Sequence, residues 1–182
     1  QVGLTETEVS GALLCLDVNE KMVDEAIRKG CNLIVSHHPL LFRGLKTISD
    51  LTDVQRTVMK AIQQGIAVIS MHTNMDNAKG GVNFRIAQKL GLTDVQFFAS
   101  KLVDGQEAGS GVIGSVAEAM AADDFVLAVK KAFDVECAMC NELLRRPIKK
   151  VAICGGAGDF LLDEALKAGA DAFITGEMHY HQ

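Results

Sequence analysis

An internal repeat constrains the fold of this chain more than any other feature of its sequence. Residues 12–36 align without a gap on residues 151–175, and each copy has the pattern of a short apolar strand, a helix and a second strand. Cys15 aligns with Cys154, and the triplet Asp-Glu-Ala occurs at the same place in the two copies. Any two strand–helix–strand units look partly alike, but the ungapped match and the identical triplet favour internal duplication. Strands that alternate with helices favour parallel pairing, so we expect an α/β fold of two similar halves with a largely parallel sheet.

Apolar runs and helical periodicity define the other expected elements. The expected strands are 12–16, 32–36, 66–71, 151–154 and 172–175, and the expected helices are 20–29, 52–64, 83–90, 123–133 and 159–167. The polar, glycine-rich segment 103–111 is expected to be a linker. We therefore expect a single domain over 1–182, with halves of about 1–100 and 110–182 that join at 101–109.

Composition excludes several classes of protein. With 182 residues, 48% of them hydrophobic and 23% charged, the chain can bury a substantial core and does not resemble a disordered protein. A net charge of −5 gives no electrostatic basis for a nucleic-acid site or for binding an anionic membrane, and no apolar run is long enough to span a bilayer. The five cysteines fit reduced thiols in a cytoplasmic protein better than a disulfide framework.

The histidines all follow expected strands. They are His37, His38, His72, His179 and His181. In open parallel sheets the carboxyl ends of the strands form the crevice in which ligands bind, so we expect these imidazoles to gather at one edge. Imidazole and carboxylate groups without a thiolate suit Zn, Fe, Mn, Co or Ni rather than a cysteine-rich structural zinc site.

The adjacent histidines His37 and His38 indicate two divalent metal ions rather than one. Neighbouring side chains of an extended segment point in different directions, and Pro39 favours an extended conformation for His38. Each imidazole can therefore hold one of two neighbouring ions, and Asp76 could bind one ion or bridge both. Two ions about 3.5–4 Å apart can activate a shared water molecule.

Other polar side chains at these strand ends each have more than one interpretation. His72 is either a catalytic residue that moves protons or a residue that orients Asp76. Glu177 is either a catalytic base, a hydrogen-bond acceptor that orients a metal ligand, or a solvated loop carboxylate. Asn74 and His181 are expected to line the site.

A glycine-rich segment lies between an expected strand and an expected helix. The backbone amides of Gly155, Gly156 and Gly158 could bind a phosphate at the N-terminus of that helix. The segment lacks the lysine of a P-loop and the spacing of a dinucleotide-binding motif, so close packing of the strand on the helix is an equal alternative.

Four motifs in order resemble the GTP cyclohydrolase 1 type 2 homologue family, also called the NIF-three-like family. They are Ser36-His37-His38-Pro39-Leu40, His72-Thr73-Asn74-Met75-Asp76, Cys154-Gly155-Gly156-Ala157-Gly158, and the segment from Gly169 to His181. The resemblance covers essentially the whole chain. It implies a two-metal site in which His37, His38 and Asp76 are ligands, and a toroidal homohexamer whose metal sites face an internal cavity.

The chain also departs from the family pattern. Members begin before Gln1 and continue past Gln182 to a Gly-His-x-x-x-Glu motif, whose histidine and glutamate complete the metal site. We therefore expect a copy that is truncated at both ends. Long members carry an additional small domain, which would be inserted near 101–109.

The resemblance implies a dinuclear metal-dependent hydrolase, in which metal-activated water attacks a nucleotide-like small molecule such as GTP. Phosphoester hydrolysis by the same site is an alternative. A third alternative is a non-catalytic metal-binding ring that binds a protein partner or handles metal.

Overall fold

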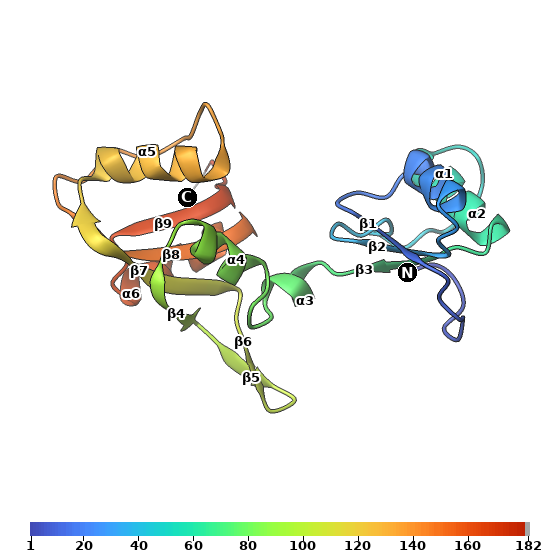
Figure 1. The fold of residues 1–182 in the computed structure, drawn as a ribbon, viewed down its shortest axis with the longest axis horizontal. Helices are drawn as coiled ribbons and strands as arrows, with labels where there is room; N and C mark the ends of the chain where they lie inside the picture. The colour runs from blue at the N-terminus through green and yellow to red at the C-terminus, as the bar shows by residue number, and fades with distance from the viewer. Residues whose placement is uncertain (181–182) are drawn as a thin grey trace. The chain divides into compact units, whose positions relative to one another are not determined.

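The structure is a computed structural model that describes residues 1–180. It divides into two compact units, Gln1–His72 and Thr73–Gln182, and each unit contains its own β-sheet with helices packed on it (Figure 1). The expected α/β class is confirmed. The first unit ends at His72, and residues 93–98 pair with a strand of the second sheet. Within the described residues, no helix is both long and apolar enough to cross a membrane.

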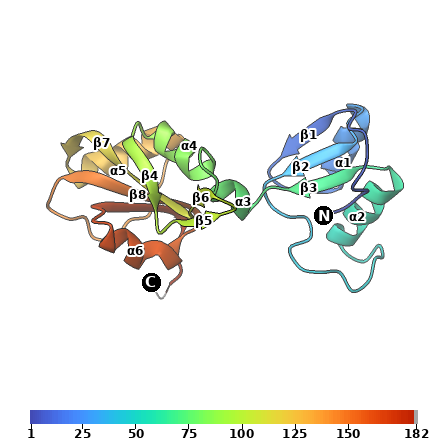
Figure 2. The same cartoon turned by 90° about the horizontal axis from the view of Figure 1, so that it is seen from below.

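The first unit is a three-stranded parallel sheet with two helices on one face (Figure 2). Its elements are β1 (Ala12–Cys15), α1 (Glu20–Arg28), β2 (Leu33–Ser36), α2 (Asp53–Gln63) and β3 (Ala67–Ser70), in the strand order β1-β2-β3. Each lies within two residues of an expected element. Each helix begins directly after a residue whose side chain caps it. Asn19 accepts a hydrogen bond from the amide of Met22, and Thr52 accepts one from the amide of Gln55.

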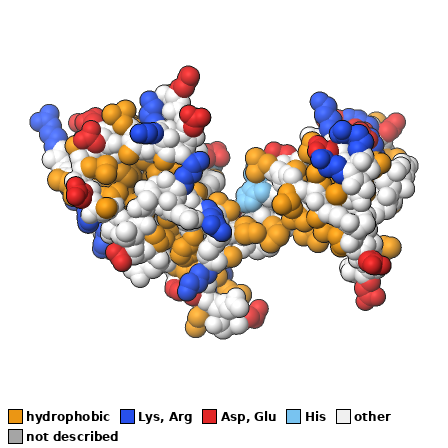
Figure 3. All heavy atoms as spheres, viewed as in Figure 1, with side chains coloured by type: hydrophobic (Ala, Val, Ile, Leu, Met, Phe, Trp, Pro, Cys, Tyr) orange, Lys and Arg blue, Asp and Glu red, His pale blue; other side chains and the backbone are white. Residues whose placement is uncertain are grey.

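Alternation along the strands gives this sheet one buried and one open face. Ile34 and Val68 are fully buried against α1 and α2. Alternate positions point the other way: Leu14, which follows half-buried Leu13 on β1, is 75% exposed, and Ile69, which follows Val68 on β3, is 49% exposed. Figure 3 shows charged side chains gathered over α1, the solvent side of the helical layer.

The second unit is a mixed sheet in the order β4-β7-β8-β9, in which only β8 and β9 are parallel. The sheet strands are β4 (Thr93–Phe98), β7 (Gly111–Met120), β8 (Ile148–Ala157) and β9 (Ala172–Glu177). The helices are α3 (Thr73–Asp76), α4 (Val82–Lys89), α5 (Ala122–Phe133), a 3-10 turn over Asp159–Leu161, and α6 (Leu162–Lys167). The sequence did not predict β4 or β7, and β7 contains glycine and alanine, which are depleted in strands. The largely parallel pairing that we expected therefore holds for the first sheet and not for the second.

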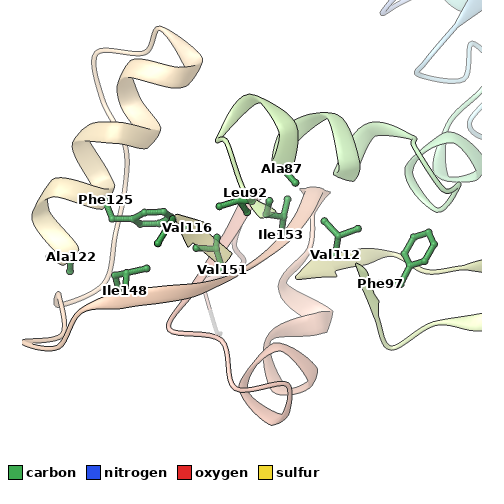
Figure 4. Packing of buried hydrophobic residues seen from close by; sticks show 10 residues of the cluster. All are labelled: Ala87, Leu92, Phe97, Val112, Val116, Ala122, Phe125, Ile148, Val151 and Ile153. Carbon is green, nitrogen blue, oxygen red and sulfur yellow. The ribbon is translucent and has the colours of Figure 1, made fainter. Parts of the chain in front are cut away.

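Helices cover both faces of the second sheet. Successive residues of β8 alternate between the two layers: Val151 and Ile153 belong to the core cluster that includes residues of α4 and α5, whereas Ala152 and Cys154 belong to the cluster that includes residues of α6. Figure 4 shows the first of these layers, with Phe125 of α5 directed toward the strands.

A β-hairpin occupies the segment that we expected to be a linker. β5 (Lys101–Val103) pairs with β6 (Gln106–Ala108), and neither strand belongs to the main sheets. Asp104 and Gly105 form the turn with φ angles of 50° and 76°. Two consecutive residues with positive φ are typical of a type I′ turn, for which Asp-Gly is a preferred sequence.

The sequence repeat is also a repeat of strand register. In the first unit β1 pairs with β2 from Ala12–Leu33 to Cys15–Ser36, and in the second unit β8 pairs with β9 from Val151–Ala172 to Cys154–Thr175. These pairs are the ones that the sequence alignment makes equivalent, and both are parallel. The shared register supports the predicted duplication.

Candidate metal centre

Three histidines lie together at the carboxyl ends of β2 and β3 in the first unit. The ring centroids of His37 and His38 are 5.1 Å apart, and those of His72 lie 5.4 Å and 6.0 Å from them. The two strands are adjacent and parallel, and the amide of Met71 donates to the carbonyl of Ser36 over 2.7 Å. Strand pairing therefore brings these imidazoles to one edge although 33 residues or more separate His72 from the others in sequence.

Hydrogen bonds fix which ring nitrogen of two histidines carries the proton. Nδ1 of His37 lies 3.0 Å from the carbonyl oxygen of Met71, and Nδ1 of His38 lies 2.8 Å from a carboxylate oxygen of Asp17. Both oxygens accept hydrogen bonds, so each Nδ1 is the donor. In the neutral ring Nε2 then carries the lone pair, which is the arrangement usual in metal-binding histidines.

Asp17 is a residue that sequence analysis missed. It follows β1, so it comes from a third strand end of the same sheet. The Asp17 side chain is 67% exposed and that of His38 is 48% exposed, and an ion pair this exposed contributes about 1 kcal/mol or less to stability. The effect of Asp17 is therefore to orient the imidazole of His38.

Asp76 and Asn74 belong to the second unit, where they lie on the single turn of α3. Asp76 is half-buried and Asn74 is exposed. The Asp76 carboxylate acts on the thiol of Cys154: burial raises the pKa of this thiol to about 11, and the charges of Asp76 and Asp159 add to the rise. Asp76 is thus close to the carboxyl end of β8.

A histidine–aspartate pair lies at the carboxyl end of β9. Nδ1 of His179 forms a hydrogen bond with a carboxylate oxygen of Asp159. This bond lowers the pKa of Asp159 and raises the pKa of His179, to which the charge of exposed Glu177 also contributes. No sequence motif singled out Asp159. His181, which we expected to line the site, lies outside the described residues.

The glycine-rich segment uses its amides within the fold. The amide of Gly155 donates to Oδ1 of Asn83 over 2.7 Å, and the amide of Gly158 donates to the hydroxyl of Thr175 over 2.9 Å. A β-carbon at Gly158 would come within 2.6 Å of Cβ of Cys154, so the strand and the following turn are in close contact there. Only Gly156 of the three expected phosphate-binding residues is exposed. This geometry favours the packing interpretation of the segment.

The donor groups present fit divalent metal ions in their chemistry. In the first unit, the imidazoles of His37 and His38 have Nδ1 atoms held by hydrogen bonds, which leaves Nε2 of each ring as a suitable ligand atom. Among residues 1–180, no three side chains of His, Cys, Asp or Glu are grouped closely enough to form a ready-made metal site.

Comparison with known proteins gives matches over the whole chain. The family model described as Duf34/NIF3 (NGG1p interacting factor 3) matches residues 1–182. A Lactococcus lactis protein named GTP cyclohydrolase 1 type 2 homolog is 36% identical, over 100% of this chain and 69% of its own length. The crystal structure of a Staphylococcus aureus hypothetical protein has a TM-score of 0.87 and 30% identity, and covers 100% of this chain and 71% of the other. That of a Bacillus cereus protein related to NIF3 has a TM-score of 0.88 and 26% identity, with coverage of 100% and 76%.

Proposed function

Because the chain belongs to the Duf34/NIF3 (NGG1p interacting factor 3) family, we propose that it is a metal-dependent hydrolase with a two-metal site. The observation that carries this proposal is the pair of hydrogen bonds from Nδ1 of His37 and Nδ1 of His38. They direct the proton of each ring away from Nε2 and so prepare two adjacent imidazoles as ligands.

We assign each polar residue a separate role. His37 and His38 are imidazole ligands, and the carboxylate of Asp76 is a further ligand. Two divalent ions bound by such residues would supply an activated water molecule and stabilise developing negative charge. His72, whose ring is beside those of the two ligands, accepts or returns a proton, and Glu177 is a second candidate for this role.

The proposed substrate class is a nucleotide-like small molecule. Its support is the name of the relatives, GTP cyclohydrolase 1 type 2 homolog, since neither a fold nor a metal site specifies a substrate. GTP and a simple phosphodiester such as bis(p-nitrophenyl) phosphate are the probes that separate purine-ring opening from phosphoester hydrolysis. Formate release from GTP supports the first reaction, and p-nitrophenol release supports the second.

A non-catalytic function is the second candidate. The family description, NGG1p interacting factor 3, names an interaction rather than a reaction. In this alternative the same residues hold metal in a homohexameric ring that binds a protein partner. The mass of the full-length protein in solution tests the hexamer, and a monomer contradicts it.

Metal content is the first test of the proposal. Elemental analysis of the purified full-length protein should find about two ions per chain, and the double variant His37→Ala/His38→Ala should lose them. His179→Ala is the matched control, because it removes a histidine that we do not assign as a ligand, and it should keep both ions. Absence of bound metal in the wild type after addition of Zn, Mn or Fe would contradict the hydrolase proposal.

Turnover then separates the enzyme from the binding protein. If His38→Ala abolishes hydrolysis and leaves the solution mass unchanged, the hydrolase proposal stands. If hydrolysis persists in metal-free protein, the metal site is not the catalytic site.

A further inference from the structure

Asn83 is a buried polar residue that connects three separate segments of the second unit. Its side chain is fully buried, at 0% exposure, in the first turn of α4. Nδ2 donates to the carbonyl of Asp76 over 3.1 Å and to the carbonyl of Ser110 over 2.9 Å, and Oδ1 accepts from the amide of Gly155 over 2.7 Å. Both amide protons and the amide oxygen therefore have partners.

These contacts reach α3, the segment before β7 and the glycine-rich end of β8. A buried amide whose donors and acceptor are all satisfied resists displacement, because any shift leaves a buried polar group without a partner. Asn83 thus fixes the distance between the backbone of Asp76 and the end of β8.

The helix that carries Asp76 has little apolar packing of its own. α3 is four residues long, and none of them is buried. Hydrogen bonds hold its C-terminal end instead: Asn83 donates to the carbonyl of Asp76, and the amide of Gly109 donates to the carbonyl of Asn77 over 3.1 Å. Hydrogen bonds to its backbone carbonyls therefore contribute to the position of the backbone of Asp76, from which the carboxylate projects.

We propose that Asn83 is the positioning residue that holds Asp76 where it can act as a metal ligand. This inference rests on the proposed function, in which Asp76 is a ligand. Asn83 itself touches neither metal nor substrate; it acts through the backbone of Asp76. Residues that hold a metal ligand in place typically change metal affinity by about 10- to 100-fold when they are replaced.

The test is calorimetric titration of metal-free, full-length protein with Zn²⁺ or Mn²⁺ alone. Asn83→Ala should weaken one of two binding events by about 10- to 100-fold and leave the other unchanged. Asp76→Asn should weaken the same event. Val151→Ala is the matched control, because it removes fully buried atoms from the same unit without touching Asp76, and it should lower the unfolding temperature without changing metal affinity.

The outcomes separate this inference from the proposed function. If the wild type binds no metal, the proposed function fails. If the wild type binds two ions and Asn83→Ala binds both unchanged, Asn83 has no positioning role, although the proposed function stands. An equal loss of affinity in Asn83→Ala and Val151→Ala would show a general effect of stability and overturn the inference. Should Asn83→Ala not fold, Asn83→Ser, which keeps a polar group at the site, takes its place.

Discussion

Ser36 and Thr175 occupy equivalent places in the two units and make the same local contact. The hydroxyl of Ser36 donates to the carbonyl of His38 over 2.8 Å, and the hydroxyl of Thr175 lies 3.2 Å from the carbonyl of Glu177. In each case the hydroxyl contacts the carbonyl of the residue two positions later; Ser36 is the last residue of β2, whereas β9 continues past Thr175 to Glu177. The duplicated part of the fold therefore includes this hydroxyl contact as well as the paired strands.

Replacing Thr175 with valine should destabilise the second unit. The hydroxyl of Thr175 is also the acceptor for the amide of Gly158, which is buried, so Thr175→Val leaves that amide without a partner. We expect a loss of about 1–3 kcal/mol in the free energy of unfolding, measured by urea denaturation. Thr175→Ser keeps the hydroxyl and should lose less. Equal stability of Thr175→Val and wild type would contradict this account of the turn.

Replacing Asp17 should weaken metal binding without unfolding the protein. Asp17→Asn removes the charge that receives the Nδ1 proton of His38, so we expect metal affinity to fall by about 10- to 100-fold in a titration with Zn²⁺. Asp24→Asn is the matched control, since Asp24 pairs with Lys60 in the same unit at 2.6 Å. A similar fall in both variants would show that Asp17 has no specific effect on His38.

Cys154 should react slowly with thiol reagents. Burial, reinforced by the charges of Asp76 and Asp159, raises the pKa of its thiol to about 11, so little thiolate is present at pH 8. Cys137 and Cys140 are exposed and should react first with Ellman's reagent. The fast amplitude should be the same in Cys154→Ala as in wild type, and a smaller amplitude in the variant would disprove the prediction.

The same thiol should make stability depend on pH at alkaline values. The pKa of Cys154 rises from 9.0 to about 11 on folding, so between these values the unfolded chain releases the proton more readily than the folded chain. Stability should therefore fall as the pH rises from about 9 to 11. Cys154→Ala should show a shallower fall in urea midpoint over this range, and an identical slope would exclude a contribution from this thiol.

The pair formed by His179 and Asp159 should stabilise the fold between the two pKa values. The bond raises the pKa of His179, so its contribution is present at low pH and is lost as the pH rises through that pKa. It lowers the pKa of Asp159, so that contribution is lost as the pH falls through the carboxyl pKa. An NMR titration should find the pKa of His179 lower in Asp159→Asn than in wild type. An unchanged pKa would mean that the two side chains do not pair in solution.

Of the five histidines that we expected at one edge, the structure groups His37, His38 and His72, and this grouping follows from strand order. His179 follows β9 in the second unit. Parallel neighbours end at the same edge, so His37 and His72 had to come close once β2 and β3 were recognised as adjacent strands. The sequence did not predict the aspartates that bind the histidines. Asp17 bonds His38 and Asp159 bonds His179, and both contacts depend on side-chain directions that no spacing rule specifies.

The antiparallel strands of the second sheet could not be predicted from local sequence patterns. β4 and β7 pair antiparallel through residues such as Phe97 and Val112, and neither strand has the strong periodicity that reveals β2. Local pattern predicts that a strand exists more readily than it predicts its partner or direction. For the hairpin the signal was present, because Asp104-Gly105 is a preferred turn sequence, but its exposed, polar strands favoured the interpretation as a linker.

The hairpin formed by β5 and β6 has a consequence for how a protein of this fold can grow. Val103 and Gln106 are paired across the turn, so the end of β5 lies next to the start of β6. A polypeptide added between Asp104 and Gly105 would leave and re-enter at almost the same point, and it would not need to stretch or separate the strands that support it. The turn is thus a site at which a whole domain can be inserted while β5 and β6 remain paired.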